Sequence, residues 1–170
     1  LRGLSTFLGY YVMQARAKAG AMRGALDIIR RYYGAMLDLG ATTMWEDFDL
    51  QWAEGAKPLD ALLREGEYDV HGDNGGYCYK GYRHSLCHGW AAGTVPFAGE
   101  YILGIRVAEA GCKKLILSPD LGDLQWAEGI FPTPYGDVRV RAEQRGGQTD
   151  IQYEAPAQIG IEILKTSEGN

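Results

Sequence analysis

Apolar side chains recur at helical spacing at the start of the chain. Between Leu4 and Ala19 they return every three or four positions, and polar side chains occupy the other side of the helical projection. An amphipathic helix repeats about every 3.6 residues, so this segment is expected to be a helix with one apolar face. That face consists of Leu4, Leu8, Tyr11, Val12 and Ala15. Ser5 and Thr6 supply candidate N-cap hydroxyls, and Gly20 ends the helix.

A second helix with the same periodicity is expected from Met22 to Leu37. Its apolar side is formed by Met22, Ala25, Leu26, Ile29, Tyr32, Tyr33, Met36 and Leu37. The connection between the two helices is short, which predicts an antiparallel helical hairpin. A third helix, largely buried, is expected from Pro96 to Gly104.

The segment 41–89 contains no long periodic run, and its glycines and tyrosines are interleaved. We expect at most one short helix in it, at Leu59–Glu65. A connection of this length inside a compact domain is usually functional.

From Gly111 onward apolar positions alternate with a period of two, which is typical of strands with one solvent-facing side. The predicted strands are 115–117, 137–143, 148–154 and 159–163, with a turn at Gly146-Gly147. The pattern predicts a chain of mixed α and β class that ends in a small antiparallel sheet or sandwich. We place the two domains at 1–108 and 109–170.

Composition narrows the possible partners. The net charge of −5 provides no basic surface for nucleic acid. No apolar run reaches the roughly 18 residues that a membrane span requires. The chain begins at Leu1 rather than Met, so we expect a piece of a longer protein, and the lack of a visible signal peptide assigns no compartment.

The most informative chemistry lies in Thr42-Thr43-Met44-Trp45-Glu46, directly after the second helix. Sugar-cleaving sites combine a carboxylate that moves protons with an aromatic face that stacks on the sugar ring. The simpler interpretation of Glu46 is a solvated acid after a helix end. The neighbouring hydroxyls and indole favour a catalytic general base instead. No general acid stands out, so we expect the chain to be an inactive part of a larger enzyme.

A second group of candidate residues lies in His84-Ser85-Leu86-Cys87-His88-Gly89-Trp90. His88 is either a core histidine or a donor to a sugar hydroxyl, and we assign His88, Trp45 and Trp90 to substrate binding.

A metal site is the rival interpretation of this loop, whose potential ligands are His71, Asp73, Cys78, His84, Cys87 and His88. Their spacing matches no standard zinc pattern, so we expect neither a metal nor another cofactor. A Cys78–Cys87 disulfide is another arrangement that the loop allows.

Three motifs in order, Gly9–Met13, Gly40–Asp47 and Ser85–Trp90, resemble the bacterial α-L-rhamnosidases of glycoside hydrolase family 78. The later segments Pro134–Val140 and Tyr153–Ala157 are similar to the small β domain that ends such enzymes. The resemblance implies the C-terminal part of an (α/α)6 barrel followed by a β-sandwich.

The resemblance also implies roles. Glu46 matches the family's general base, and His88 matches a histidine that contacts the bound sugar. The full-length parent would hydrolyse terminal α-L-rhamnosides with inversion, in the cytoplasm or periplasm of a bacterium. Its partners would be a rhamnose-containing glycoside or polysaccharide and the N-terminal remainder of the enzyme, which would supply the general acid.

Two alternatives stay open. One is a related (α/α)6 glycosidase that acts on another sugar, such as a uronide. The other is a non-catalytic carbohydrate-binding or interaction module in which Glu46 is structural.

Overall fold

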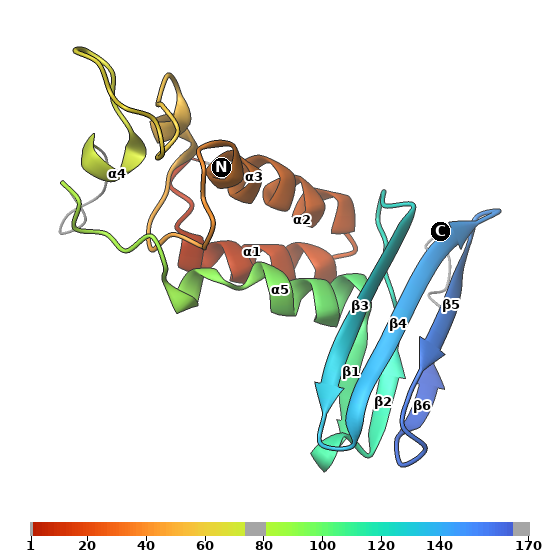
Figure 1. Ribbon diagram of the computed structural model, residues 1–170. Coiled ribbons are helices and arrows are strands. Elements are labelled where there is room, and N and C mark those ends of the chain that lie inside the picture. Colours follow the sequence, from red (N-terminus) through yellow and green to blue (C-terminus); the bar gives the residue numbers. More distant parts are fainter. Residues whose placement is uncertain (1, 74–80, 165–170) are drawn as a thin grey trace. The chain divides into compact units, whose positions relative to one another are not determined.

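The computed structural model describes residues 2–73 and 81–164 (Figure 1). They form two compact units, Leu1–Thr94 and Val95–Asn170. Helices and loops make up the first unit, and two small sheets dominate the second. The predicted mixed α and β class is confirmed.

The helical hairpin of the first unit follows the predicted ranges. Helix α1 spans Thr6–Lys18, and the Ser5 side chain caps it by accepting a hydrogen bond from the Leu8 amide. Helix α2 (Met22–Ile28) continues through a π-helical turn (Ile29–Tyr33) into α3 (Gly34–Asp38), and this helix returns alongside α1 in Figure 1. The π-helical turn adds one residue to a helical turn, which hydrophobic periodicity alone does not reveal.

The apolar stripe predicted for α1 does not face the core of the first unit. The buried residues of the helix are Thr6, Gly9 and Met13, whereas Leu8 is 51% exposed and lines an open apolar groove. Close packing decides this, because a Cβ at Gly9 would lie 2.5 Å from the Tyr33 hydroxyl oxygen. Only the side of α1 that carries Gly9 can approach the second helix so closely.

The loop after α3 contains short helical turns at Leu50–Ala53 and Gly89–Ala91, and helix α4 at Val70–Asp73. The predicted helix at Leu59–Glu65 is wrong, since this stretch consists of turns, a bend and irregular backbone. The loop is nevertheless anchored, because its aromatic residues Trp45 and Phe48 are buried with Tyr32 of the π-helical turn.

Helix α5 (Thr94–Phe97) starts on the last residue of the first unit, and the second unit continues it through a π-helical turn (Ala98–Ile102). Strand β1 (Ile105–Glu109) follows almost at once, so the third predicted helix ends two residues earlier than expected. The predicted boundary after residue 108 therefore falls inside β1. Leu103 and Ile105, on the N-terminal side of that boundary, pack in the same core as the later strands.

The six strands of the described residues form two three-stranded sheets. One sheet has the order β1-β2-β6, with β2 at Lys114–Leu117 and β6 at Gly160–Ile163. The other has the order β3-β4-β5, with strands at Trp126–Thr133, Gly136–Arg145 and Gln148–Glu154. The four predicted strands and the Gly146-Gly147 turn are present, and β1 and β3 were not predicted.

The expectation of a wholly antiparallel arrangement is wrong at one pairing. Strands β2 and β6 are parallel, with Leu115 opposite Ile161. After β5 the chain leaves the second sheet and enters the first beside the start of β2, where the Gly160 amide donates to the Lys113 carbonyl. Alternation identifies a strand but not its partner, so the sequence pattern did not contain this information.

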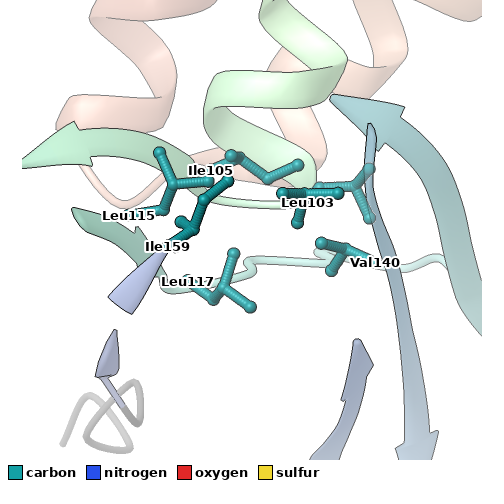
Figure 2. Close-up of a cluster of buried hydrophobic side chains, with 7 residues drawn as sticks. Leu103, Ile105, Leu115, Leu117, Val140 and Ile159 are labelled. Carbon is teal, nitrogen blue, oxygen red and sulfur yellow. The ribbon is translucent and has the colours of Figure 1, made fainter. Parts of the chain in front are cut away.

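One hydrophobic core serves both sheets (Figure 2). Its buried members are Leu103, Ile105, Leu115, Leu117, Val138, Val140 and Ile159. The alternating residues of β4 supply the contribution of the second sheet, as the period-two pattern predicted.

Gly104 is expected to tolerate no side chain. Its φ is +65°, and a Cβ there would overlap the Ser118 carbonyl group. Gly104→Ala should lower the free energy of unfolding by about 2–5 kcal/mol, which combines left-handed strain with overpacking. Gly111→Ala is the matched control, because Gly111 has a similar φ of +72° with nothing within 4 Å. Equal losses in chemical denaturation would contradict this account.

Candidate functional site

Two loop segments far apart in sequence pair with each other in the first unit. The Glu46 amide donates to the Ser85 carbonyl at 2.8 Å, and the His88 amide donates to the Met44 carbonyl at 2.9 Å. The Thr43 hydroxyl donates to the Leu86 carbonyl. These bonds bring together the two sequence motifs from which the site was predicted.

The Glu46 carboxylate is held at one oxygen. Its Oε2 accepts a 2.8 Å hydrogen bond from the Ser85 amide, and its Oε1 lies 3.8 Å from His88 Nδ1. The Glu46 side chain is 14% exposed and the His88 side chain 32% exposed. The pair is thus sheltered without being sealed from solvent, which suits a carboxylate that must reach a water molecule.

The main chain of Glu46 is held as well. Its carbonyl oxygen accepts hydrogen bonds from the Thr6 hydroxyl at 2.6 Å and from Trp90 Nε1 at 3.0 Å. The Trp90 ring is 44% exposed, and its centroid lies 4.4 Å from that of His88. The structure therefore places Trp90 beside Glu46 and His88.

Trp45 lies in the core instead. Its side chain is 1% exposed and packs edge-to-face against Phe48, with ring centroids 5.6 Å apart. A buried indole offers no face to a sugar ring, so the predicted stacking role of Trp45 does not fit its position. What the residue does is anchor the segment that carries Glu46.

Sequence reasoning missed the support that two tyrosines give to this segment. The Tyr32 hydroxyl lies 2.6 Å from the carbonyl oxygens of both Leu4 and Phe48, and its single proton serves one at a time. The Tyr33 hydroxyl donates to the Thr6 carbonyl at 3.1 Å. Two adjacent tyrosines on the buried side of a helix are the available signal, because a buried phenol requires a hydrogen-bond partner.

Stability should fall at high pH because of these tyrosines. Burial raises the pKa of Tyr33 from 10.0 to about 12, and burial, with Tyr33, Asp47 and Asp49 nearby, also raises the pKa of Tyr32. Above pH 10 the unfolded chain loses phenol protons that the folded chain keeps, so the free energy of unfolding decreases as pH rises. Tyr33 alone should contribute a loss on the order of 2 kcal/mol between pH 10 and 12.

Denaturant titrations across this pH range would measure the loss, with phenolate absorbance reporting ionisation. In Tyr33→Phe the decrease should be shallower. A pH-independent free energy of unfolding in the wild type would contradict the assignment.

The metal-site interpretation of the loop gains no support. The rings of His71 and His84 lie 5.2 Å apart, but His88 is turned toward Glu46. Cys78, and with it the Cys78–Cys87 disulfide, lies outside the described residues, as does the side chain of Asp73. Among the residues that are described, no group of three or more His, Cys, Asp or Glu is arranged to hold a metal ion.

No helix in the described ranges has the length and apolar character of a membrane span.

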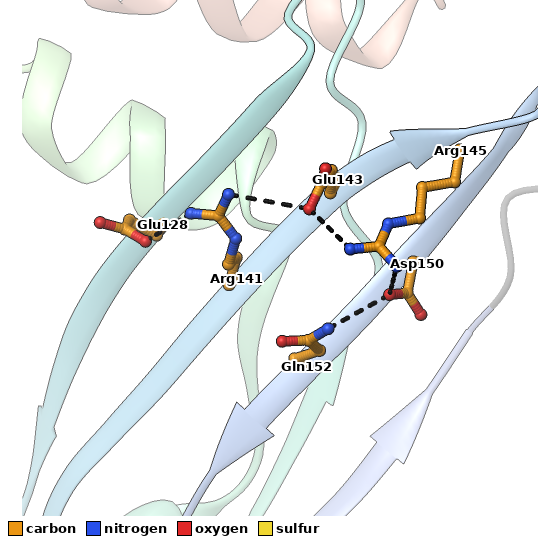
Figure 3. A network of polar contacts seen from close by, with 6 residues as sticks. All are labelled: Glu128, Arg141, Glu143, Arg145, Asp150 and Gln152. Carbon is orange, nitrogen blue, oxygen red and sulfur yellow. Dashed lines mark hydrogen bonds and ion pairs between the residues drawn. The ribbon is translucent and has the colours of Figure 1, made fainter.

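The second unit has a separate hollow on the face of β3-β4-β5. Its volume is about 670 Å³, and the side chains along it include Glu128, Ile130, Arg139, Arg141, Gln152 and Glu154. Figure 3 shows the polar network that crosses this face, in which Arg141 pairs with Glu128 at 2.7 Å and Arg145 with Glu143 at 3.2 Å. The Arg141–Glu128 pair joins β4 to β3, and the Arg145–Glu143 pair lies within β4. Exposed ion pairs of this kind contribute little each.

The known proteins to which this chain is similar are α-L-rhamnosidases. Residues 104–169 match the family model described as the bacterial alpha-L-rhamnosidase C-terminal domain. An alpha-L-rhamnosidase from Alteromonas sp. (strain LOR) is 34% identical over 127 residues, which is 74% of this chain and 11% of that protein. The chain thus spans about a tenth of the length of this curated relative.

Solved structures of rhamnosidases are also similar to this chain. A GH78 family rhamnosidase of Bacillus sp. GL1 matches with a TM-score of 0.69 and 30% identity, covering 94% of this chain and 15% of that one. The Streptomyces avermitilis alpha-L-rhamnosidase complexed with L-rhamnose matches with a TM-score of 0.56 and 20% identity, over 89% of this chain and 13% of that one. The latter similarity is evidence of fold.

Proposed function

Because the chain corresponds to the C-terminal domain region of family 78 α-L-rhamnosidases, we propose that it is part of an inverting α-L-rhamnosidase. In this enzyme Glu46 is the general base, and His88 and Trp90 line the sugar site. One observation carries the proposal: the Glu46 carboxylate, with Oε2 fixed by the Ser85 amide, keeps Oε1 beside His88.

The chemistry follows from this geometry. Glu46 Oε1 takes a proton from a water molecule whose oxygen attacks the anomeric carbon of the rhamnoside. The bond from that carbon to the aglycone oxygen breaks, and a general acid on the other side of the sugar protonates the leaving oxygen. In inverting enzymes the two carboxyl groups lie about 6.5–9.5 Å apart, which leaves room for the water.

His88 has a separate part in the proposal. Its Nδ1 faces Glu46 at 3.8 Å, so its Nε2, on the other side of the ring, is the atom available to a sugar hydroxyl. The Trp90 ring next to it supplies the exposed apolar surface. Together they would fix the ring while Glu46 acts on the water.

We further propose that the helices of the first unit belong to an (α/α)6 barrel and that the second unit is the β-sandwich that follows it. The apolar groove on α1, lined by Leu4, Leu8, Tyr11 and Val12 among others, supports this proposal. Preceding helices of a larger enzyme would cover that groove and would supply the general acid. An exposed apolar stripe of this kind usually marks a packing surface.

A product analysis on the full-length protein tests the function. Proton NMR of aryl α-L-rhamnoside hydrolysis should show β-L-rhamnose as the first product, before mutarotation. An aryl glucuronide of the same leaving group should react far more slowly. First appearance of the α anomer, or preference for the uronide, would overturn the proposal.

A non-catalytic carbohydrate-binding function is the second candidate, and the hollow on β3-β4-β5 favours it. Its polar side chains are held by ion pairs beside the exposed apolar residue Ile130. Titration of the chain with L-rhamnose, followed by amide NMR shifts, separates the two functions. Shifts at Arg139 and Gln152 without shifts at Ser85 and His88 would support the binding module.

A further inference from the structure

We infer that Thr6 is a positioning residue for Glu46, an inference that rests on the proposed general-base role of Glu46. Thr6 is the first residue of α1 and is fully buried. Its hydroxyl reaches across 40 positions of sequence to donate a 2.6 Å hydrogen bond to the Glu46 carbonyl oxygen.

The hydroxyl of Thr6 is not needed to cap its own helix. The Ser5 side chain already performs that task by accepting from the Leu8 amide at 3.1 Å. A threonine hydroxyl in a helix usually bonds locally, to the cap or to a carbonyl one turn back. The Thr6 bond instead ends on the peptide of the proposed base.

Thr6 can locate that peptide because its own main chain is fixed. The Tyr33 hydroxyl donates to the Thr6 carbonyl oxygen at 3.1 Å. The Tyr32 hydroxyl lies 2.6 Å from the Leu4 carbonyl oxygen, just before the helix. The start of α1 is therefore tied to the second helix, and Thr6 transmits that position to Glu46.

The direction of the Glu46 carboxylate depends on this contact. Thr6 and Trp90 both donate to its carbonyl oxygen, while the Ser85 amide donates to Oε2. If the Thr6 donor is lost, the peptide can rotate about the remaining bonds, and the distance from Oε1 to the reacting water changes. Misplacement of a catalytic group by about 1 Å can cost on the order of 100-fold in rate.

Thr6→Val in the full-length protein tests the inference, since valine keeps the shape and removes the donor. We expect kcat on aryl α-L-rhamnoside to fall about 10- to 100-fold with KM within about twofold of wild type, because Thr6 touches no sugar. Thr6→Ser, which keeps the hydroxyl, should restore kcat. Thr133→Val is the matched control, because it removes a 2.6 Å hydroxyl-to-carbonyl bond in the other unit.

Two further variants distinguish a failure of the Thr6 role from poor folding and from a failure of the proposed function. Should Thr6→Val fold poorly, Thr6→Cys, a weak donor of similar size, should give a kcat between those of serine and valine. Wild-type kcat in Thr6→Val, a raised KM instead of a lowered kcat, or equal losses in valine and serine variants would overturn the role of Thr6. Undiminished turnover of Glu46→Gln would overturn the proposed function itself, which separates the two failures.

Discussion

Glu46→Gln in the full-length protein is expected to lower kcat on aryl α-L-rhamnoside by about 10²–10⁴, the usual contribution of a general base. Glutamine keeps the shape of the side chain and can still accept from the Ser85 amide at its oxygen. It cannot take a proton from water. KM should therefore stay near the wild-type value while turnover collapses.

The control for Glu46→Gln is Glu54→Gln, the same change at an exposed glutamate of the first unit. That variant should retain full activity. Steady-state kinetics on both proteins, with circular dichroism to verify folding, provide the measurement. Wild-type kcat in Glu46→Gln would remove Glu46 from the reaction and leave it a structural residue that pairs two loops.

Trp45→Ala is expected to lower the free energy of unfolding by about 3–5 kcal/mol, the usual range for emptying the space of a buried tryptophan. Trp45 packs with Phe48, which in turn packs against Tyr32. The cavity would open directly beneath the segment that carries Glu46. Denaturant unfolding monitored by far-ultraviolet circular dichroism would measure the change.

Trp126→Ala is the matched comparison for Trp45→Ala, because the Trp126 side chain is 50% exposed and lies beside the Arg141 guanidinium. Its loss should cost less than about 1 kcal/mol, the range of an exposed cation–π contact. A stable Trp45→Ala with weakened affinity for rhamnose would instead restore the stacking role first predicted for this residue.

The resemblance to family 78 that the motifs suggested is confirmed by the family model and by the related proteins. The motifs identified the segments that form the candidate site, because a motif is a short run of residues that can be recognised directly in the sequence. The proposed roles of Glu46, His88 and Trp90 are supported by their mutual placement and stay predictions until the kinetics are measured.

Hydrophobic periodicity predicted helices and strands well where they depend on the local sequence. The helices at Thr6–Lys18 and Met22–Asp38 and the hairpin of β4 and β5 lie within a few residues of their predicted ranges. In each, the spacing of apolar residues and a nearby glycine turn are contained in the segment itself.

Periodicity does not show which residues are buried where packing against another part of the chain decides it. Leu8 carries a larger apolar side chain than Gly9, yet Gly9 faces the core, because only glycine admits the Tyr33 hydroxyl. The sequence neighbours of Trp45 suggested a sugar-binding residue. Its side chain is instead buried against Phe48, which packs on Tyr32 of the second helix.

By itself, the sequence determined the helices, most of the strands, the resemblance to family 78 and the two segments that hold the candidate site, since each of these is encoded over a short stretch. Tertiary structure alone decided which face of α1 is buried, that β6 runs parallel to β2, and that Thr6, Tyr32 and Tyr33 support Glu46. The physical reason is that these contacts join groups distant in sequence, whose approach depends on packing and on the need of buried polar groups for partners.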